Sequence, residues 1–167
     1  NSSSKDLTHN FDATDWYRIN IFLSNFSEQY FYSLDHNDAY SLVHFAYLHN
    51  LINNHDALWL NTDTDHYLMD TELTDQTLLR FFGHTVEHDS HSKTYSSGYT
   101  DTIDYGTHGY YFPAASGEFY GYISIANSMY QHGDGTYTVF FDVYAVVPSR
   151  TFLEKVFQYI LPSLLYY

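Results

Sequence analysis

The chain has 167 residues, 44% of them hydrophobic, which is enough for the core of one domain. Twenty acidic residues against six Lys and Arg give a net charge of −14, and this argues against nucleic-acid binding because phosphate contacts require clustered basic side chains. No run of 18 apolar residues occurs, so we expect no membrane insertion, and the lack of Cys excludes disulfides, thiol catalysis and thiolate metal sites.

Two amphipathic helices are predicted near the beginning of the sequence. Residues 1–11 are expected to be a linker or a disordered segment, and a helix-start signal follows at Asp12 to Asp15. Apolar residues then recur at spacings of three and four, which predicts a helix that faces a core through Trp16, Ile19, Leu23, Phe26 and Tyr30. A second helix is expected from Asp38 to about Asn53.

The middle of the chain mixes short elements. The pattern predicts a brief strand at 67–69, a helix capped by Thr74 and ended by Gly83, and a strand at 85–87. A polar loop rich in Ser, Thr and Tyr is expected as far as Asp104. A strand at 110–112 then stops at Pro113.

Residues 117–147 are the strongest structural signal, because two long β-type runs flank a glycine-rich turn at 133–135. A type I turn closed by Gly135 in the left-handed region places Ile125 opposite Val143, and a two-residue turn at Asp134-Gly135 would instead pair Met129 with Phe140. We favour the first register, because it gathers the apolar residues of both strands on one dry, helix-covered face and leaves a wet face rich in tyrosine.

Helices that precede strands predict the α+β class. We expect residues 12–167 to form a single α+β domain, with the N-terminal helices packed on one face of a curved antiparallel sheet that contains the 117–147 hairpin. A cystatin-like or nuclear-transport-factor-like cone is the analogy that fits this order. Residues 149–161 are expected to form a closing helix, with a strand as the alternative.

Three stretches carry a family resemblance: residues 17–28, residues 78–83, and residues 110–117 together with 133–138. In these stretches the chain resembles an uncharacterised family of Gram-positive cell-surface lipoproteins and zinc-ribbon-tethered extracellular domains. The resemblance implies a secreted or cell-surface location in the Gram-positive envelope. It offers no catalytic residues.

One acidic loop has the spacing of a calcium site. Oxygen ligands at positions 1, 3, 5 and 12 of an EF-hand loop correspond here to Asn61, Asp63, Asp65 and Glu72. Position 6 requires glycine for a sharp turn and is His66 here, so we favour a plain acidic loop that leads into a helix. The calcium-stabilised module remains one alternative function.

Histidine is the commonest zinc ligand, and three histidines cluster at His84, His88 and His91. Gly83 is expected to end the preceding helix, so His84 and His88 would not share a helical face. With 11 His in the chain, a local cluster arises easily by chance, and we predict neither a metal nor another cofactor.

The wet hairpin face is the best binding candidate. Tyrosine rings there would stack on a sugar or a peptide side chain, assisted by a carboxylate, and the set is Tyr120, Tyr122, Tyr130, Tyr144 and Asp142. The predicted function is a non-enzymatic extracellular domain that binds a glycan or a peptide. The alternative is a secreted hydrolase of cell-wall or glycan substrates, for which the sequence singles out no carboxylate pair.

Overall fold

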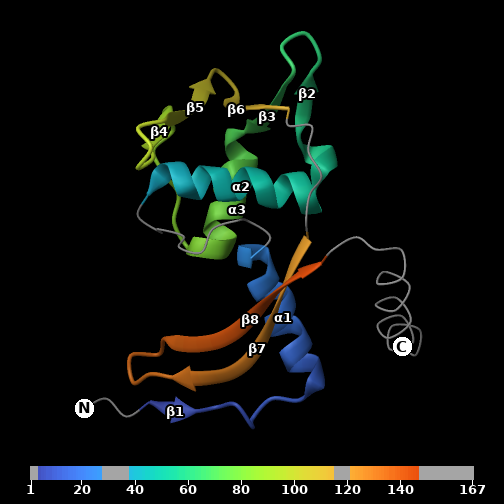
Figure 1. Ribbon diagram of the computed structural model, residues 1–167, viewed down its shortest axis with the longest axis vertical. Helices are drawn as coiled ribbons and strands as arrows, with labels where there is room; N and C mark the ends of the chain where they lie inside the picture. The colour runs from blue at the N-terminus through green and yellow to red at the C-terminus, as the bar shows by residue number, and fades with distance from the viewer. Residues whose placement is uncertain (1–3, 28–37, 115–120, 147–167) are drawn as a thin grey trace. The chain divides into compact units, whose positions relative to one another are not determined.

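The computed structural model describes residues 4–27, 38–114 and 121–146 (Figure 1). The chain forms two compact units. Unit 1 combines Asn1–Glu28 with Glu118–Tyr167, and unit 2 is Gln29–Gly117. The prediction of a single domain over 12–167 stays a prediction.

In its described residues, unit 1 contains one helix and a three-stranded antiparallel sheet. The helix is α1 (Ala13–Ser27), and the strands β1 (Lys5–Asp6), β7 (Gly121–Gln131) and β8 (Tyr137–Val146) lie in the order β1-β7-β8. Asp12 caps α1, because its Oδ1 accepts hydrogen bonds from the backbone N–H groups of Thr14 and Asp15 at 2.8 and 2.9 Å. The helix runs beside the β7–β8 hairpin, as Figure 1 shows.

The predicted register holds at the turn end of the hairpin. His132 N–H donates to Thr136 O, Gly135 has a φ of 85°, and Met129 lies opposite Val139. Only glycine adopts this left-handed conformation without a steric cost, which fixes the turn type. The alternative pairing of Met129 with Phe140 is therefore wrong.

A β-bulge at Asn127 shifts the register in the far half of the hairpin. Ser128 pairs with Phe140 and Ala126 with Phe141, so Asn127 has no partner across the ladder. Ile125 consequently lies opposite Asp142, and the predicted pairing of Ile125 with Val143 is wrong. One extra residue turns every side chain of β7 before the bulge to the other face of the sheet.

The two sides of the β7–β8 ribbon therefore differ from the predicted dry and wet faces. The helix side, on which α1 lies, carries Tyr122, Ser124, Ala126, Met129, Tyr137, Val139, Phe141 and Val143. The open side carries Ile123, Ile125, Ser128, Tyr130, Thr138, Phe140, Asp142 and Tyr144. The expectation that Ile125 belongs to a helix-covered core is wrong, because its side chain is exposed on the open side.

Over residues 38–114, unit 2 combines two α-helices with a five-stranded antiparallel sheet of order β2-β3-β6-β5-β4. The helices are α2 (Ala39–Asn53) and α3 (Thr71–Phe82), and a short 3₁₀ turn, η1, spans His55–Ala57. The strands are β2 (Trp59–Asn61), β3 (His66–Asp70), β4 (His91–Thr94), β5 (Thr100–Gly106) and β6 (Gly109–Pro113).

The main described core lies in unit 2, where α2 and α3 pack together and onto the sheet (Figure 1). Val43, Ala46, Met69, Leu78 and Tyr110 are fully buried in it. Gly109 begins β6 opposite Asp70 of β3 and must be glycine, because a Cβ at this position would lie 2.2 Å from the carbonyl oxygen of Met69.

Several predicted boundaries in unit 2 change. The N-cap of α3 is Asp70, whose Oδ1 accepts from Leu73 N–H at 2.7 Å, and Thr74 lies inside the helix. The C-cap at Gly83 is confirmed by its φ of 76°. The strand predicted at 85–87 is absent from the described chain, and β4 and most of β5 occupy the stretch that was expected to be a loop.

The α+β class is confirmed, with the described strands divided between two antiparallel sheets. The cone analogy stays a prediction. Residues 149–161 lie outside the described residues, as does Tyr30. Of the helices in the described ranges, none has the length and the apolar character that a membrane crossing requires.

Candidate functional site

The outer edge of β7 is closed by side chains of unit 1. Ala126 N–H donates to Asn20 Oδ1 at 2.8 Å, and Ser124 N–H donates to Ser24 Oγ at 3.0 Å. Nearer the turn, Met129 N–H donates to Thr8 Oγ1 at 3.2 Å, and β1 pairs with the last residues of β7. A helix laid along an edge in this way prevents pairing with another strand and holds α1 against the sheet.

This attachment leaves an apolar hollow of about 480 Å³ between α1, the segment after β1 and the turn end of the ribbon. It is lined by Leu7, Asn10, Phe11, Ile19, Met129 and Tyr137. Asn10 N–H donates to Leu7 O at 2.8 Å, which forms the turn that carries Asn10 to the hollow. Phe11 is held by an edge-to-face contact with Trp16 at 5.5 Å. Three separate stretches of the chain thus build one concave surface.

The lining of the hollow is mostly apolar. Its lining side chains are aliphatic, aromatic, thioether or amide, and none is a carboxylate. The Tyr137 side chain at its rim is 54% exposed, so a ring is available for contact with a ligand. The volume of the hollow falls in the range of pockets that hold small ligands.

The predicted tyrosine set does not share one face. Tyr130 and Tyr144 lie on the open side of the ribbon, and Tyr122 lies on the helix side because of the bulge. Tyr120 lies outside the described residues. Asp142, on the open side, accepts a hydrogen bond from Asn127 Nδ2 at 3.0 Å. Of the described tyrosines in this set, Tyr144 is the most exposed.

The four predicted calcium ligands are separated by a strand. Asn61, Asp63 and Asp65 belong to the β2–β3 hairpin, where Asp65 has a φ of 53° and Asp63 N–H donates to Asn61 Oδ1. Glu72 lies beyond β3, in the first turn of α3, and accepts from Gln76 Nε2 at 3.0 Å. Five extended residues span about 17 Å, which is much more than the diameter of one coordination shell.

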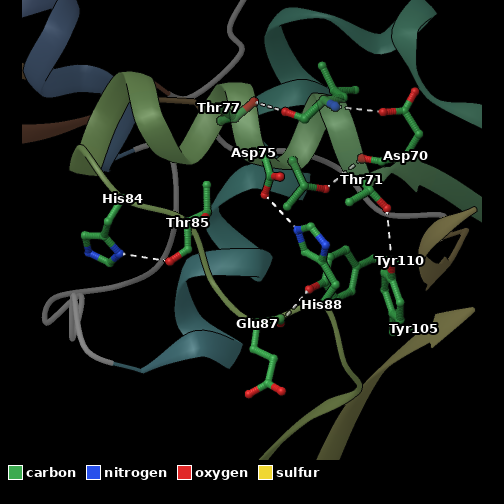
Figure 2. Close-up of polar contacts among 12 residues, drawn as sticks. Asp70, Thr71, Asp75, Thr77, His84, Thr85, Glu87, His88, Tyr105 and Tyr110 are labelled. Carbon is green, nitrogen blue, oxygen red and sulfur yellow. Dashed lines mark hydrogen bonds and ion pairs between the residues drawn. The ribbon is translucent and has the colours of Figure 1, made fainter.

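The three clustered histidines have separate partners. His88 Nε2 lies 3.0 Å from Asp75 Oδ1, and a ring nitrogen of His84 lies 3.1 Å from Thr85 O, as Figure 2 shows. His91 Nε2 lies 3.1 Å from Glu87 O. In the described part of the chain, no three His, Asp or Glu side chains form a group that could hold a metal ion.

A polar cluster ties the beginning of α2 to β4 and β5. Tyr40 Oη donates to Asp101 Oδ2 at 2.6 Å, and Lys93 Nζ lies 3.3 Å from Asp38 Oδ2 and 3.0 Å from Ser41 Oγ. Burial and the Asp101 carboxylate raise the pKa of Tyr40. Burial alone would raise the pKa of Asp38, but hydrogen bonds from Ser41 and Lys93 outweigh it and hold that pKa below its usual value. Each group has a partner, so the cluster anchors a helix end.

Other tyrosine and histidine side chains of unit 2 have pKa values that burial shifts. Burial raises the pKa of Tyr47 and of Tyr110 to about 12. Burial also lowers the pKa of His44, which stacks on Tyr40 with ring centroids 5.9 Å apart, and that of His49. Tyr110 Oη donates to Glu87 O at 3.3 Å and thereby holds the segment before β4 on the core.

Sequence reasoning missed the hollow, since its lining comes from residues 7–19, 129 and 137. Residues 7–11 were assigned to a linker, although Leu7 is buried and Phe11 is half-buried. The sequence did contain a signal that residues 7–11 contact the fold: Leu7 and Phe11 are apolar residues in an otherwise polar segment. A linker without contacts needs no apolar residues.

Comparisons with protein-family models, with curated proteins and with solved structures each found no match. The resemblance to Gram-positive surface lipoproteins therefore stays a prediction.

Proposed function

We propose that this chain is a non-catalytic binding domain of the Gram-positive cell envelope, and that unit 1 holds its ligand in the apolar hollow. The observation that carries the proposal is the hollow itself. Three separate stretches of the chain line it, and the exposed Tyr137 ring stands at its rim. Concave apolar surfaces with few polar groups are typical of binding sites.

The lining favours a peptide over a glycan. A sugar is held by an aromatic ring together with several hydrogen-bonding side chains around its hydroxyl groups. Here Asn10 and the Tyr137 hydroxyl are the polar side-chain groups of the lining. An aromatic or branched aliphatic side chain of a peptide satisfies such a surface better, because its burial requires no hydrogen-bond partner.

Among the residues that the structure describes, no observation supports the hydrolase alternative. A glycosidase needs a carboxylic acid with a raised pKa beside a second carboxylate. Hydrogen bonds from Thr8 and Thr136 lower the pKa of Asp6 and Asp134, respectively. The pKa of Asp38 is also below its usual value. The envelope location rests on the family resemblance.

The test follows the methyl NMR signal of Met129 during titration with short peptides. We expect an alanine tetrapeptide that contains one phenylalanine to shift this signal saturably. The same peptide with serine in place of phenylalanine, and a peptidoglycan disaccharide, should have little effect. Tyr137→Ser should weaken binding by roughly three- to tenfold, since an aromatic contact contributes about 0.5–1.5 kcal/mol.

Tyr99→Ser provides the matched control, because Tyr99 is also exposed but belongs to unit 2. Its affinity for the peptide should equal that of the unmodified protein. Saturation by the disaccharide with no response to the peptide would favour a glycan ligand. No response to either probe, or an equal loss in both variants, would contradict a peptide site in the hollow.

A further inference from the structure

One face of the five-stranded sheet of unit 2 points away from α2 and α3. Met69 and Tyr110 lie opposite each other in the ladder and are buried in the core with residues of both helices. Because side chains alternate along a strand, their neighbours Leu68 and Tyr111 lie on the other side, which we call the outer face. The register extends the outer face across all five strands, and its residues include Trp59, Leu68, Tyr111, Asp104, Thr102, Thr100, Ser92 and Thr94.

Two aromatic rings lie in one row of the outer face. Trp59, Leu68 and Tyr111 are successive partners across β2, β3 and β6. Neighbouring strands are about 4.8 Å apart, so the two aromatic residues are separated by about 10 Å. Trp59 is 60% exposed. The ring of Tyr111 lies over Gly106, where an added Cβ would meet the Cε2 atom of that ring at 2.7 Å.

The part of the outer face that belongs to β4 and β5 is lined by hydroxyl groups. Ser92 Oγ lies 2.9 Å from Thr102 Oγ1, and Thr94 Oγ1 lies 2.9 Å from Thr100 Oγ1. A hydroxyl offers one donor and two acceptor positions, so each pair keeps an O–H group and lone pairs for a further partner. Asp104 is exposed as well and lies in the same row as the two rings.

We propose that the outer face of unit 2 is a second binding site, and that its ligand is a neutral glycan chain. The apolar faces of sugar rings stack on aromatic side chains, and the sugar hydroxyl groups bond to side-chain hydroxyls and carboxylates. Trp59 and Tyr111 provide the stacking surface, and the hydroxyl pairs together with Asp104 provide the polar partners. The two units of the chain thus bind ligands of different chemistry.

Charge and polarity favour a glycan over other partners. None of the Lys and Arg residues that the structure describes in unit 2 belongs to the outer face, because Arg80 is in α3 and Lys93 bonds to Asp38 from the opposite side of β4. An anionic ligand therefore finds no counter-charge there. A helix or a sheet packed on the outer face would bury its hydroxyl groups and its carboxylate away from water, which costs free energy unless each one is paired.

Titration of the full chain with cellopentaose and with chitopentaose, two neutral oligosaccharides, tests the proposal. The chain has two Trp, so a Trp16→Phe background reports Trp59 alone. We expect the fluorescence of Trp59 to change saturably with at least one of these sugars. In calorimetry, Trp59→Ala should weaken binding by roughly three- to tenfold, because an aromatic contact is lost.

Leu60→Ala is the matched control, because Leu60 follows Trp59 in β2, is 40% exposed and points to the other face of the sheet. It should bind the sugar as the unmodified protein does. Thr102→Val removes one hydroxyl of the outer face at nearly constant shape, and it should weaken binding by roughly two- to tenfold.

Unchanged Trp59 fluorescence with both sugars, or equal affinities in Trp59→Ala and Leu60→Ala, would overturn the proposal. Saturation of the Trp59 signal by the phenylalanine peptide in place of the sugars would do so as well, since it would assign the outer face to a peptide. Trp59→Ala should leave the response of Met129 to that peptide unaltered, because Met129 belongs to unit 1. The glycan site and the hollow are therefore tested separately.

Discussion

Asn20→Ala should weaken the attachment of α1 to the edge of β7, because it removes a hydrogen bond between them. The side chain of Asn20 accepts a hydrogen bond from Ala126 N–H at 2.8 Å, and Ala126 is half-buried. A buried donor left without a partner costs about 1–3 kcal/mol. The higher helix propensity of Ala returns about 0.5 kcal/mol. We therefore expect the free energy of unfolding of unit 1 to fall by about 1–2 kcal/mol.

Asn25→Ala is the matched control on the same helix. Asn25 Nδ2 donates to Ile21 O and Phe22 O within α1, so its removal orphans no strand amide. The propensity gain is the same in both variants and cancels in the comparison. Asn25→Ala should leave stability unchanged or raise it slightly.

Urea unfolding followed by tryptophan fluorescence measures the difference. The chain has two Trp, Trp16 in unit 1 and Trp59 in unit 2, so a Trp59→Phe background reports unit 1 alone. The midpoint should fall with an unchanged m-value. Amide exchange of Ala126 should accelerate by roughly 5- to 30-fold. Equal midpoints for the two Asn variants, with Ala126 exchange unaltered, would refute the role of α1 in closing this edge.

Two further predictions concern unit 2. Leu78→Ala should lower the free energy of unfolding by about 2–5 kcal/mol in a urea titration, because Leu78 is fully buried. The neighbouring Leu79 is 53% exposed, so Leu79→Ala should lower it by less than about 1 kcal/mol. Similar losses in the two variants would contradict the placement of the core. Burial lowers the pKa of His44; the Asp101 carboxylate opposes this shift, and the positive charge of Lys93 adds to it. Near the pKa of the unfolded state, the unfolded chain binds more protons at His44 than the folded protein does. The contribution of His44 to stability is therefore present above its unfolded pKa of about 6.5 and is lost as the pH falls below that value. His44→Gln should flatten the fall in thermal midpoint between about pH 7 and 5.5, whereas the exposed control His84→Gln should not; parallel curves for the two variants would contradict the buried neutral histidine.

Local signals in the sequence predicted several elements correctly. The capped start at Asp12, the apolar periodicity of 39–53 and the left-handed glycines Gly83 and Gly135 each act over a few residues. Such signals depend on backbone sterics and on hydrogen bonds to nearby groups, which a sequence displays directly. For the same reason the hairpin register was correct next to its turn.

The strands β4 and β5 were missed because their pairing is polar. Ser92 faces Thr102 and Thr94 faces Thr100, with hydroxyl contacts of 2.9 Å, on an exposed surface. Strands of this kind lack apolar alternation and resemble a loop in the sequence. Their inner residue Ile103 is buried only because α2 and β6 lie nearby in the folded unit.

The sequence by itself determined the α+β class, the two long helices, the turn at Gly135 and the acidity of the surface, because each follows from local sterics, periodicity or composition. Tertiary structure decided which side chains meet. The bulge at Asn127 inverted half of β7, and hydroxyl and amide groups of α1 accept hydrogen bonds from the edge of that strand. A one-residue insertion in a ladder and a hydrogen bond between residues 106 positions apart leave no periodic trace in the chain, and the lining of the hollow comes together only in the folded unit.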